Sequence, residues 1–377
     1  MPISCRTAGS SPCFTIPANG GTGFRNTTGA KDILLGRHQA WLREHQPRLA
    51  NQPATPFHPS GPSDLIRARY PSEWHPTTYI GQQTAAFIRR QQGGTQPWFA
   101  FCSFIAPHHP FEAPDYQIAR YRGAPLQAAG KGGVDPRSIP FPAAQVIGEF
   151  ERYPVDIQRQ IVLHYLASIS LIDDAVGQVL DVLRRSGQAD DTIILFTSDH
   201  GEFAGNHGLL RKPSIHFDEL IRVPLLVHVP GGTLPPRREA GLVELTDVCP
   251  TLLGLLEIAP PPGLQGIDWT AALRRRGTVG REDIYADMFD LEPMTCGRRG
   301  GPYQAVQTLR TPEWKLNLYP TAGSVYGQLF NVREDPDETR NRYGDPSCRD
   351  VRGELLWRLA SRLHGQTDPL PPFLTQF

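Results

Sequence analysis

The sequence predicts an α/β fold: a mixed, mainly parallel sheet between helices, with a smaller C-terminal antiparallel sheet that carries one helix. Two observations lead to this prediction. A long helical pattern over residues 154–187 runs directly into a short apolar run that is typical of a buried strand. The chain after residue 290 shows short strand patterns in succession, followed by one amphipathic helix. We therefore expect an irregular or disordered segment 1–36, a main α/β domain 37–290 and a C-terminal antiparallel subdomain 291–377.

The helix over 154–187 has the clearest pattern, because its apolar residues recur at spacings of three and four. Arg184 and Arg185 suit the negative end of the helix dipole, and Gly187 ends the helix. The same reasoning predicts the other elements. Helices are expected over 38–45, 76–92, 246–258 and 350–364, and strands over 98–104, 192–197, 223–229, 303–310, 314–319 and 328–332.

Composition excludes several classes of partner. Lys plus Arg and Asp plus Glu both number 38, so bulk charge suggests neither a nucleic acid nor an acidic membrane as partner. No apolar run approaches the roughly 18 residues that a membrane helix needs. The first residues contain no apolar signal-peptide core, which favours the cytoplasm. The six cysteines are scattered without a C-x-x-C pair, so neither a zinc ribbon nor a disulfide framework is indicated.

Chemically capable residues follow two of the predicted strands. Asp199 and His200 come directly after the strand at 192–197, and a carboxylate beside an imidazole can ligate one divalent cation. Lys212 adds a fixed positive charge shortly afterwards. His108 follows the strand predicted at 98–104. Taken singly, each residue has an ordinary explanation, since Asp-His-Gly is usually a turn and an isolated lysine or histidine usually lies at the surface.

The ordered series of motifs is more specific than its parts. S-D-H-G-E, N-H-G-L-x-x-K and E-L-x-R-V-P-L-L-V-x-x-P-G closely resemble the second metal-binding segment of the sulfatase family, within the alkaline-phosphatase-like superfamily. S-F-x-x-P-H-H-P-F resembles the segment whose first histidine, here His108, contacts the sulfate group. K-L-N-L-Y and L-F-N-V-R-E-D-P-D-E resemble the C-terminal subdomain of the family.

The resemblance implies a function and a set of site residues. Asp199 and His200 would bind one divalent cation, usually Ca²⁺ in this family, with Mn²⁺ or Zn²⁺ also tolerated by a histidine ligand. His108 and Lys212 would hold the sulfate group and assist departure of the alcohol. The substrate would be a small-molecule sulfate ester. A phosphate or phosphonate ester is the alternative within the superfamily, and neither the alcohol part of the substrate nor the oligomeric state is indicated.

One part of the family pattern is missing. Sulfatases use a formylglycine nucleophile made from Cys or Ser in a C/S-x-P-S-R motif, and none of the six cysteines stands in such a context. The sequence TLPPR at 233–237 mimics the motif loosely but lies after the late strand. The paired acidic residues at 173–174 and 190–191 do not end strands either, so they are not expected to be metal ligands. We interpret the chain as N-terminally truncated or as a degenerate paralogue, and truncation is the favoured interpretation. The polypeptide as written is then expected to be inactive, or to be a non-catalytic protein that binds anions or a partner.

Overall fold

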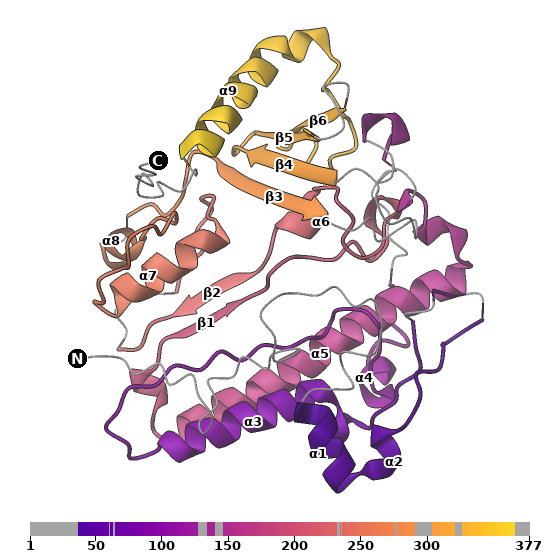
Figure 1. Ribbon diagram of the computed structural model, residues 1–377, viewed down its shortest axis with the longest axis vertical. Helices are drawn as coiled ribbons and strands as arrows, with labels where there is room; N and C mark the ends of the chain where they lie inside the picture. Colours follow the sequence, from indigo (N-terminus) through magenta and orange to yellow (C-terminus); the bar gives the residue numbers. More distant parts are fainter. Residues whose placement is uncertain are drawn as a thin grey trace, which may run out of the picture. The chain divides into compact units, whose positions relative to one another are not determined.

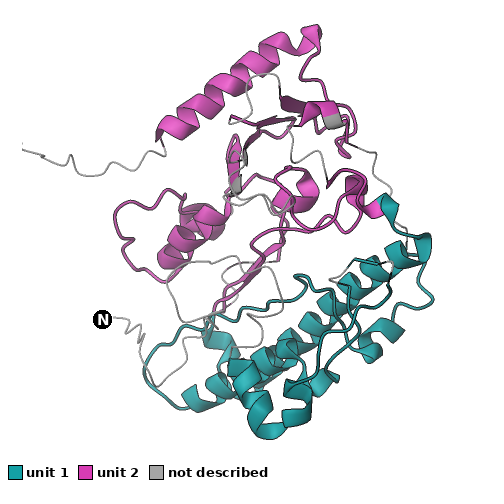
Figure 2. Cartoon of the chain, turned by 45° about the vertical axis from the view of Figure 1, so that its right-hand side comes forward, with its two compact units in different colours: residues 1–128, 151–192 teal, residues 129–150, 193–377 magenta. Residues whose placement is uncertain are grey.

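The structure is a computed structural model that describes residues 37–59, 61–62, 65–126, 134–139, 146–231, 234, 236–275, 277–290, 304–320 and 326–365. The predicted irregular segment 1–36 lies outside these residues. The chain forms two compact units, coloured separately in Figure 2. Unit 1 comprises residues 1–128 and 151–192, and unit 2 comprises residues 129–150 and 193–377. Among the described helices, none combines the length and the apolar character that a membrane crossing requires.

The named elements of unit 1 are all helices, joined by long irregular segments, and two long helices form its centre. The predicted helix at 154–187 is confirmed as α5, and α3 packs along it (Figure 1). A Cβ added to Gly81 of α3 would lie 3.0 Å from Cβ of Ala175 in α5, so two small residues allow this close approach. The helices of unit 1 are α1 (Arg37–His45), α2 (Pro47–Ala50), α3 (Pro76–Gln91), α4 (Asp115–Ala119) and α5 (Val155–Arg185).

Unit 2 contains a two-stranded ribbon, a four-stranded sheet and four α-helices among its described residues. The ribbon joins β1 to β2, and the sheet has the order β3-β4-β5-β6. The strands are β1 (Ile194–Thr197), β2 (Leu225–His228), β3 (Ile284–Asp290), β4 (Gln304–Arg310), β5 (Trp314–Leu318) and β6 (Gly327–Asn331). The helices are α6 (Asp218–Ile221), α7 (Val248–Leu255), α8 (Thr270–Arg274) and α9 (Arg349–Gly365).

Both faces of the four-stranded sheet are covered. Leu309, Leu316 and Leu329 point to the face that packs on α9, as Figure 1 shows for the elements themselves. Val306 and Phe330 point to the opposite face, which packs on the loop and short helix between β1 and β2; this second core also contains Phe203, Leu209, Ile215, Phe217 and Leu220. The alternation of strand side chains therefore attaches the segment after β1 to the C-terminal sheet.

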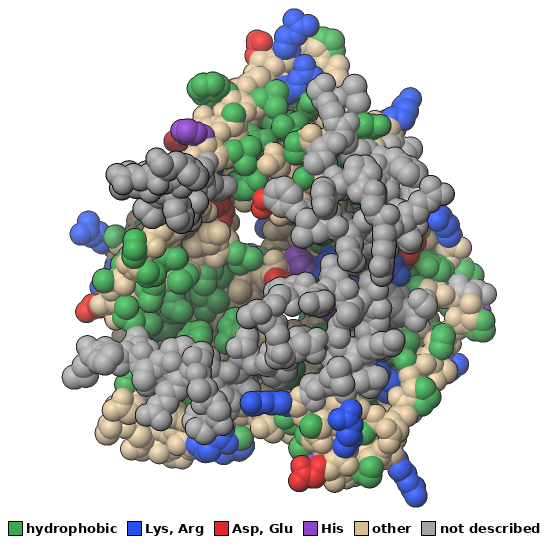
Figure 3. All heavy atoms as spheres, in the orientation of Figure 1, with side chains coloured by type: hydrophobic (Ala, Val, Ile, Leu, Met, Phe, Trp, Pro, Cys, Tyr) green, Lys and Arg blue, Asp and Glu red, His purple; other side chains and the backbone are tan. Residues whose placement is uncertain are grey.

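Two strand predictions need correction. Residues 98–104 form no strand in the structure, and Phe99 is 54% exposed, because an aromatic run becomes a strand only where a neighbouring segment provides hydrogen bonds. The strands β1 and β2 were expected to be buried, yet Leu226 is 60% exposed. Figure 3 shows hydrophobic side chains gathered in the region of α7 and β2. The six strands named above pair antiparallel, and among the described residues the expected parallel pairing is seen only at the isolated bridge between Leu65 and Phe111.

The C-terminal antiparallel sheet and its helix are confirmed, with one addition. Strand β3 pairs along its length with β4, from Ile284 opposite Arg310 to Asp290 opposite Gln304. The predicted boundary at residue 290 had left this strand in the preceding domain. The sequence from 284 to 290 mixes apolar and acidic residues, so its pattern gave no strand signal.

Candidate active site

Asp199 and His200 occupy the turn that follows β1. The backbone N–H of His200 donates to Asp199 Oδ1 over 2.9 Å, and Ser198 Oγ donates to the His200 carbonyl over 3.0 Å. These bonds fix the turn and leave the Asp199 side chain 84% exposed. Asp199 Oδ2 lies 3.6 Å from His200 Nε2, so the two predicted metal ligands face one another.

Gly201 is required at the next position by its close approach to α6. Its N–H donates to the Leu220 carbonyl over 2.7 Å, and a Cβ at this position would overlap the carbonyl oxygen of Glu219. The S-D-H-G sequence thus has a steric basis, since a side chain at the glycine would push the turn away from α6.

The loop from Glu202 to Arg211 returns the chain to this turn. The Glu202 carboxylate accepts from the N–H groups of Ala204 and Arg211 at the two ends of the loop. Gly205 donates its N–H to the Leu209 carbonyl over 2.8 Å. Because the loop closes on itself, Lys212 comes back to the residues that follow β1.

The returned Lys212 Nζ lies 3.0 Å from His200 Nε2. Burial lowers the pKa of Lys212 below its ordinary value, while the carboxylates of Asp199 and Glu202 act in the opposite direction. Asp199, His200 and Lys212 therefore meet within unit 2, as the sequence predicted for these three residues.

The donor set fits a divalent cation at two coordination positions. A carboxylate oxygen and an imidazole nitrogen are both common metal ligands, and the Lys212 ammonium already places one positive charge beside them. Within the described residues there is no cluster of three or more His, Cys, Asp and Glu side chains that could hold a metal ion.

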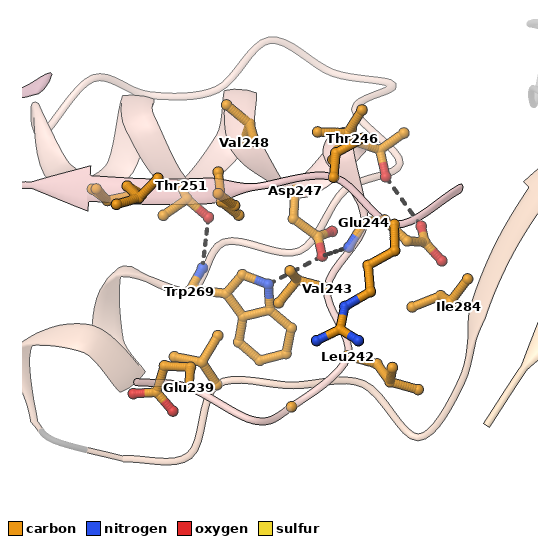
Figure 4. A pocket seen from close by; sticks show the side chains of 18 of the residues that line it. Glu239, Leu242, Val243, Glu244, Thr246, Asp247, Val248, Thr251, Trp269 and Ile284 are labelled. Carbon is orange, nitrogen blue, oxygen red and sulfur yellow. Dashed lines mark hydrogen bonds between the residues drawn. The ribbon is translucent and has the colours of Figure 1, made fainter. Parts of the chain in front are cut away.

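A cavity of about 1650 Å³ in unit 2 opens beside this cluster. Its lining includes Asp199, His200 and Lys212, and also residues that the sequence patterns had not singled out for the site: His216, Asp218, Arg222 and Arg310. Figure 4 shows another part of the same pocket, where Asp247 accepts from the indole Nε1–H of Trp269 over 3.1 Å. The cavity thus combines cationic, acidic and apolar side chains.

His108 lies in unit 1, apart from the sequence segment that carries the other three residues. It is exposed and lies between the cis peptide bonds Ala106-Pro107 and His109-Pro110. Its Nδ1–H donates to the His109 carbonyl over 2.6 Å, and its ring stacks on that of His109 at 4.0 Å. The convergence of His108 with Asp199, His200 and Lys212 stays a prediction.

Comparison with known families agrees with the motif order. The profile described as Sulfatase matches residues 34–258, and the profile described as N-sulphoglucosamine sulphohydrolase, C-terminal, matches residues 205–364. The chain belongs to the sulfatase family. This family generally uses a divalent metal and a formylglycine.

Individual relatives are distant. An arylsulfatase of Clostridium perfringens is 26% identical over 310 residues, which cover 79% of this chain and 61% of that sulfatase. The chain therefore spans less than two thirds of that relative's length.

Two solved structures share the fold. A phosphonate monoester hydrolase from Silicibacter pomeroyi superposes with a TM-score of 0.73 at 22% identity, over 88% of this chain and 69% of that one. A protein in complex with D-glucosamine-2-N,6-O-disulfate gives a TM-score of 0.67 at 18% identity, over 79% and 71% of the two chains. The predicted alkaline-phosphatase-like fold is confirmed.

Proposed function

We propose that the function of the protein is the metal-dependent hydrolysis of small-molecule sulfate esters, and that Asp199, His200 and Lys212 form the part of the active site that binds metal and sulfate. Turnover also needs a nucleophile, and the 377 residues contain none in the C/S-x-P-S-R context. The observation that supports this proposal most directly is the meeting of Asp199 Oδ2, His200 Nε2 and Lys212 Nζ beside one cavity. Family membership supplies the reaction class.

Each residue has a proposed role. Asp199 and His200 would hold one divalent cation, with Ca²⁺ as the first choice and Mn²⁺ or Zn²⁺ as alternatives, because an imidazole is a softer ligand than an oxygen. A bound cation polarises the sulfate group. Lys212 would bind a sulfate oxygen and stabilise the charge that develops on it. We propose His108 as a second sulfate-binding residue that helps protonate the departing alcohol.

Sulfate binding by the purified chain tests these roles. We expect inorganic sulfate to bind measurably in the presence of Ca²⁺ or Mn²⁺, and binding to be lost in Asp199→Ala and Lys212→Ala. Unchanged sulfate affinity in both variants would contradict the assignment. A crystal structure with His108 more than about 15 Å from Asp199, the length of roughly four to five extended residues, would remove His108 from the site. Side chains that far apart could not bind the same sulfate group.

A second candidate is hydrolysis of phosphate or phosphonate esters. His200 supports it, since a histidine ligand also suits Mn²⁺ and Zn²⁺. Parallel titrations with sulfate and phosphate separate the two candidates, because tighter phosphate binding that depends on Asp199 would favour the phosphorus esters.

We expect calcium to bind weakly to this chain. Asp199 and His200 provide two ligands, and Ca²⁺ prefers about six to eight oxygen ligands. Calorimetric titration with CaCl₂ is the measurement. A sub-micromolar affinity would mean that other carboxylates complete the site.

A further inference from the structure

The hydrogen bonds of His200 define which ring nitrogen carries the lone pair. The Gly201 carbonyl lies 2.7 Å from Nδ1 and can only accept, so Nδ1 carries the hydrogen. The Lys212 ammonium lies 3.0 Å from Nε2 and can only donate, so Nε2 presents its lone pair to Lys212. His200 is therefore the neutral tautomer whose Nε2 is suited to binding a metal.

The same lone pair cannot serve the ammonium and a cation at once. We propose that Lys212 occupies His200 Nε2 when the cation is absent, and that a divalent cation bound by Asp199 and His200 displaces the Lys212 ammonium. The displaced ammonium is then released to bind an anionic group. Lys212 lines the same cavity as His200, so the anion would bind in that cavity. The identity of that anion as a sulfate ester rests on the proposed function, whereas the competition for Nε2 does not.

Displacement couples the two ligands of the site. A partly buried ammonium that has lost its hydrogen-bond acceptor is costly to leave unpaired, so cation binding increases the affinity of Lys212 for an anion. By thermodynamic reciprocity, the anion must increase the affinity for the cation by the same factor. Lys212 would then connect loading of the metal with binding of the anionic group.

The competition predicts an unusual gain of metal binding on mutation. In the full chain without substrate, Lys212→Met should increase the affinity for Mn²⁺ by about fivefold or more, because the competing donor is removed. Arg222→Met is the matched control, since Arg222 lines the same cavity and also carries one positive charge. Mn²⁺ binding is followed by electron paramagnetic resonance at low and high ionic strength, because salt screens a general charge effect more than a direct displacement.

The outcomes are distinct. A gain in Lys212→Met that exceeds the gain in Arg222→Met and persists at high salt supports displacement. Equal gains in both variants, no gain, or a loss in Lys212→Met overturns it. Mn²⁺ titrations with and without inorganic sulfate should also show mutual enhancement in the wild type and in Arg222→Met but not in Lys212→Met, and equal enhancement in all three proteins would overturn the proposal.

If Lys212→Met folds poorly, nuclear magnetic resonance of the wild type tests the displacement without any variant. In wild type labelled with ¹⁵N in both histidine and lysine, Zn²⁺ should move the Nε2 resonance of His200 while Nδ1 keeps its hydrogen. The Nζ resonance of Lys212 should move with the same midpoint. A His200 shift without any Lys212 shift contradicts displacement. A different result would contradict the proposed function alone. In that case the protein would bind no sulfate, while its metal titrations would still show that Lys212 and the cation compete for His200 Nε2.

Discussion

At the scale of single residues, Gly201 sets the distance between α6 and the turn that carries Asp199 and His200. Gly201→Ala would place its Cβ against the Glu219 carbonyl, which belongs to backbone and cannot rotate away. We expect a loss of about 1–3 kcal/mol in the free energy of unfolding, as for other overpacked sites, together with weaker Mn²⁺ binding. Urea denaturation and Mn²⁺ titration are the measurements.

Gly177→Ala is the matched control for that change. Gly177 lies within α5, and a Cβ there would meet no atom within 4 Å among the described residues. Alanine in a helix interior is favoured over glycine by up to about 1 kcal/mol. The control should therefore be neutral or stabilising, and an equal loss in both variants would refute the steric account of Gly201.

His164 gives the chain a pH-dependent stability. Burial lowers the pKa of His164 from 6.5 to about 4, although Asp115 acts against this shift. Between these two pH values the unfolded imidazole takes up a proton that the folded one does not. The free energy of unfolding should therefore fall as the pH falls, by about 1.4 kcal/mol per pH unit from this group.

His164→Gln tests that pH dependence, because it removes the titrating ring. The decline in urea stability between pH 6.5 and pH 4 should be shallower in the variant than in the wild type. His45→Gln, which changes an exposed histidine of α1, should leave the decline unchanged. Parallel curves for wild type and His164→Gln would show that other groups cause the acid sensitivity.

Local sequence was sufficient to predict that some residues of the candidate site lie close together, but it missed others. Asp199, His200 and Lys212 could be predicted because a strand, a glycine turn and a loop closed by Glu202 bring them together within a short stretch. His216 and Asp218 line the same cavity but were missed. Their positions depend on Thr308, Asn317 and Lys315, which lie far along the chain and share no local pattern with them.

At the scale of elements, a buried polar face of the C-terminal sheet holds the segment that follows Lys212. His216 donates from Nδ1 to Thr308 Oγ1 over 2.8 Å, and its carbonyl accepts from Asn317 over 2.8 Å. Lys315 is 0% exposed, and its ammonium lies 3.1 Å from Asp218 Oδ1 and forms an ion pair with Glu338. Loss of this ammonium would leave buried carboxylates without their partner.

Lys315→Met should therefore destabilise the protein by about 3–5 kcal/mol in urea denaturation. The double variant with Glu338→Gln should lose less free energy of unfolding than the two single variants lose together, because the second change removes one of the unpaired charges. Arg358→Met removes a more exposed cation of α9 that pairs with Glu354, and should cost about 1 kcal/mol or less. A similar small loss in Lys315→Met would contradict the importance of the buried cluster.

Helices were easier to predict than strands for a physical reason. The pattern that defines α5 lies within one segment, and its cap and its apolar stripe are local. A strand needs a partner, so the aromatic run at 98–104 formed none, while β3 became a strand through its pairing with β4. In K-L-N-L-Y, Lys315 and Asn317 alternate with leucines, yet both are fully buried against the segment that holds His216 and Asp218. Alternation alone therefore does not show which face of a strand meets solvent.

At the scale of the whole molecule, membership of the sulfatase family does not by itself show that this chain carries every residue that the reaction needs. The sulfatase profile matches residues 34–258, a range that contains the proposed site residues Asp199, His200 and Lys212. Covalent hydrolysis also needs an activated nucleophile beside the metal. None of the six cysteines in the 377 residues begins a C-x-P-S-R sequence, and no serine does so.

We therefore predict that the 377-residue polypeptide hydrolyses no sulfate ester at an enzymatic rate. Sulfate binding by Lys212 would not restore turnover, since binding the substrate without a nucleophile leaves the reaction barrier in place. The measurement is a purified-protein assay with an aryl sulfate and Ca²⁺ or Mn²⁺, and Asp199→Ala is the control. Turnover in the wild type that disappears in Asp199→Ala would mean that another residue, or a water activated by the cation, attacks the sulfur. Turnover that persists in Asp199→Ala would instead indicate a contaminating enzyme, because the proposed reaction depends on the Asp199 carboxylate as a metal ligand.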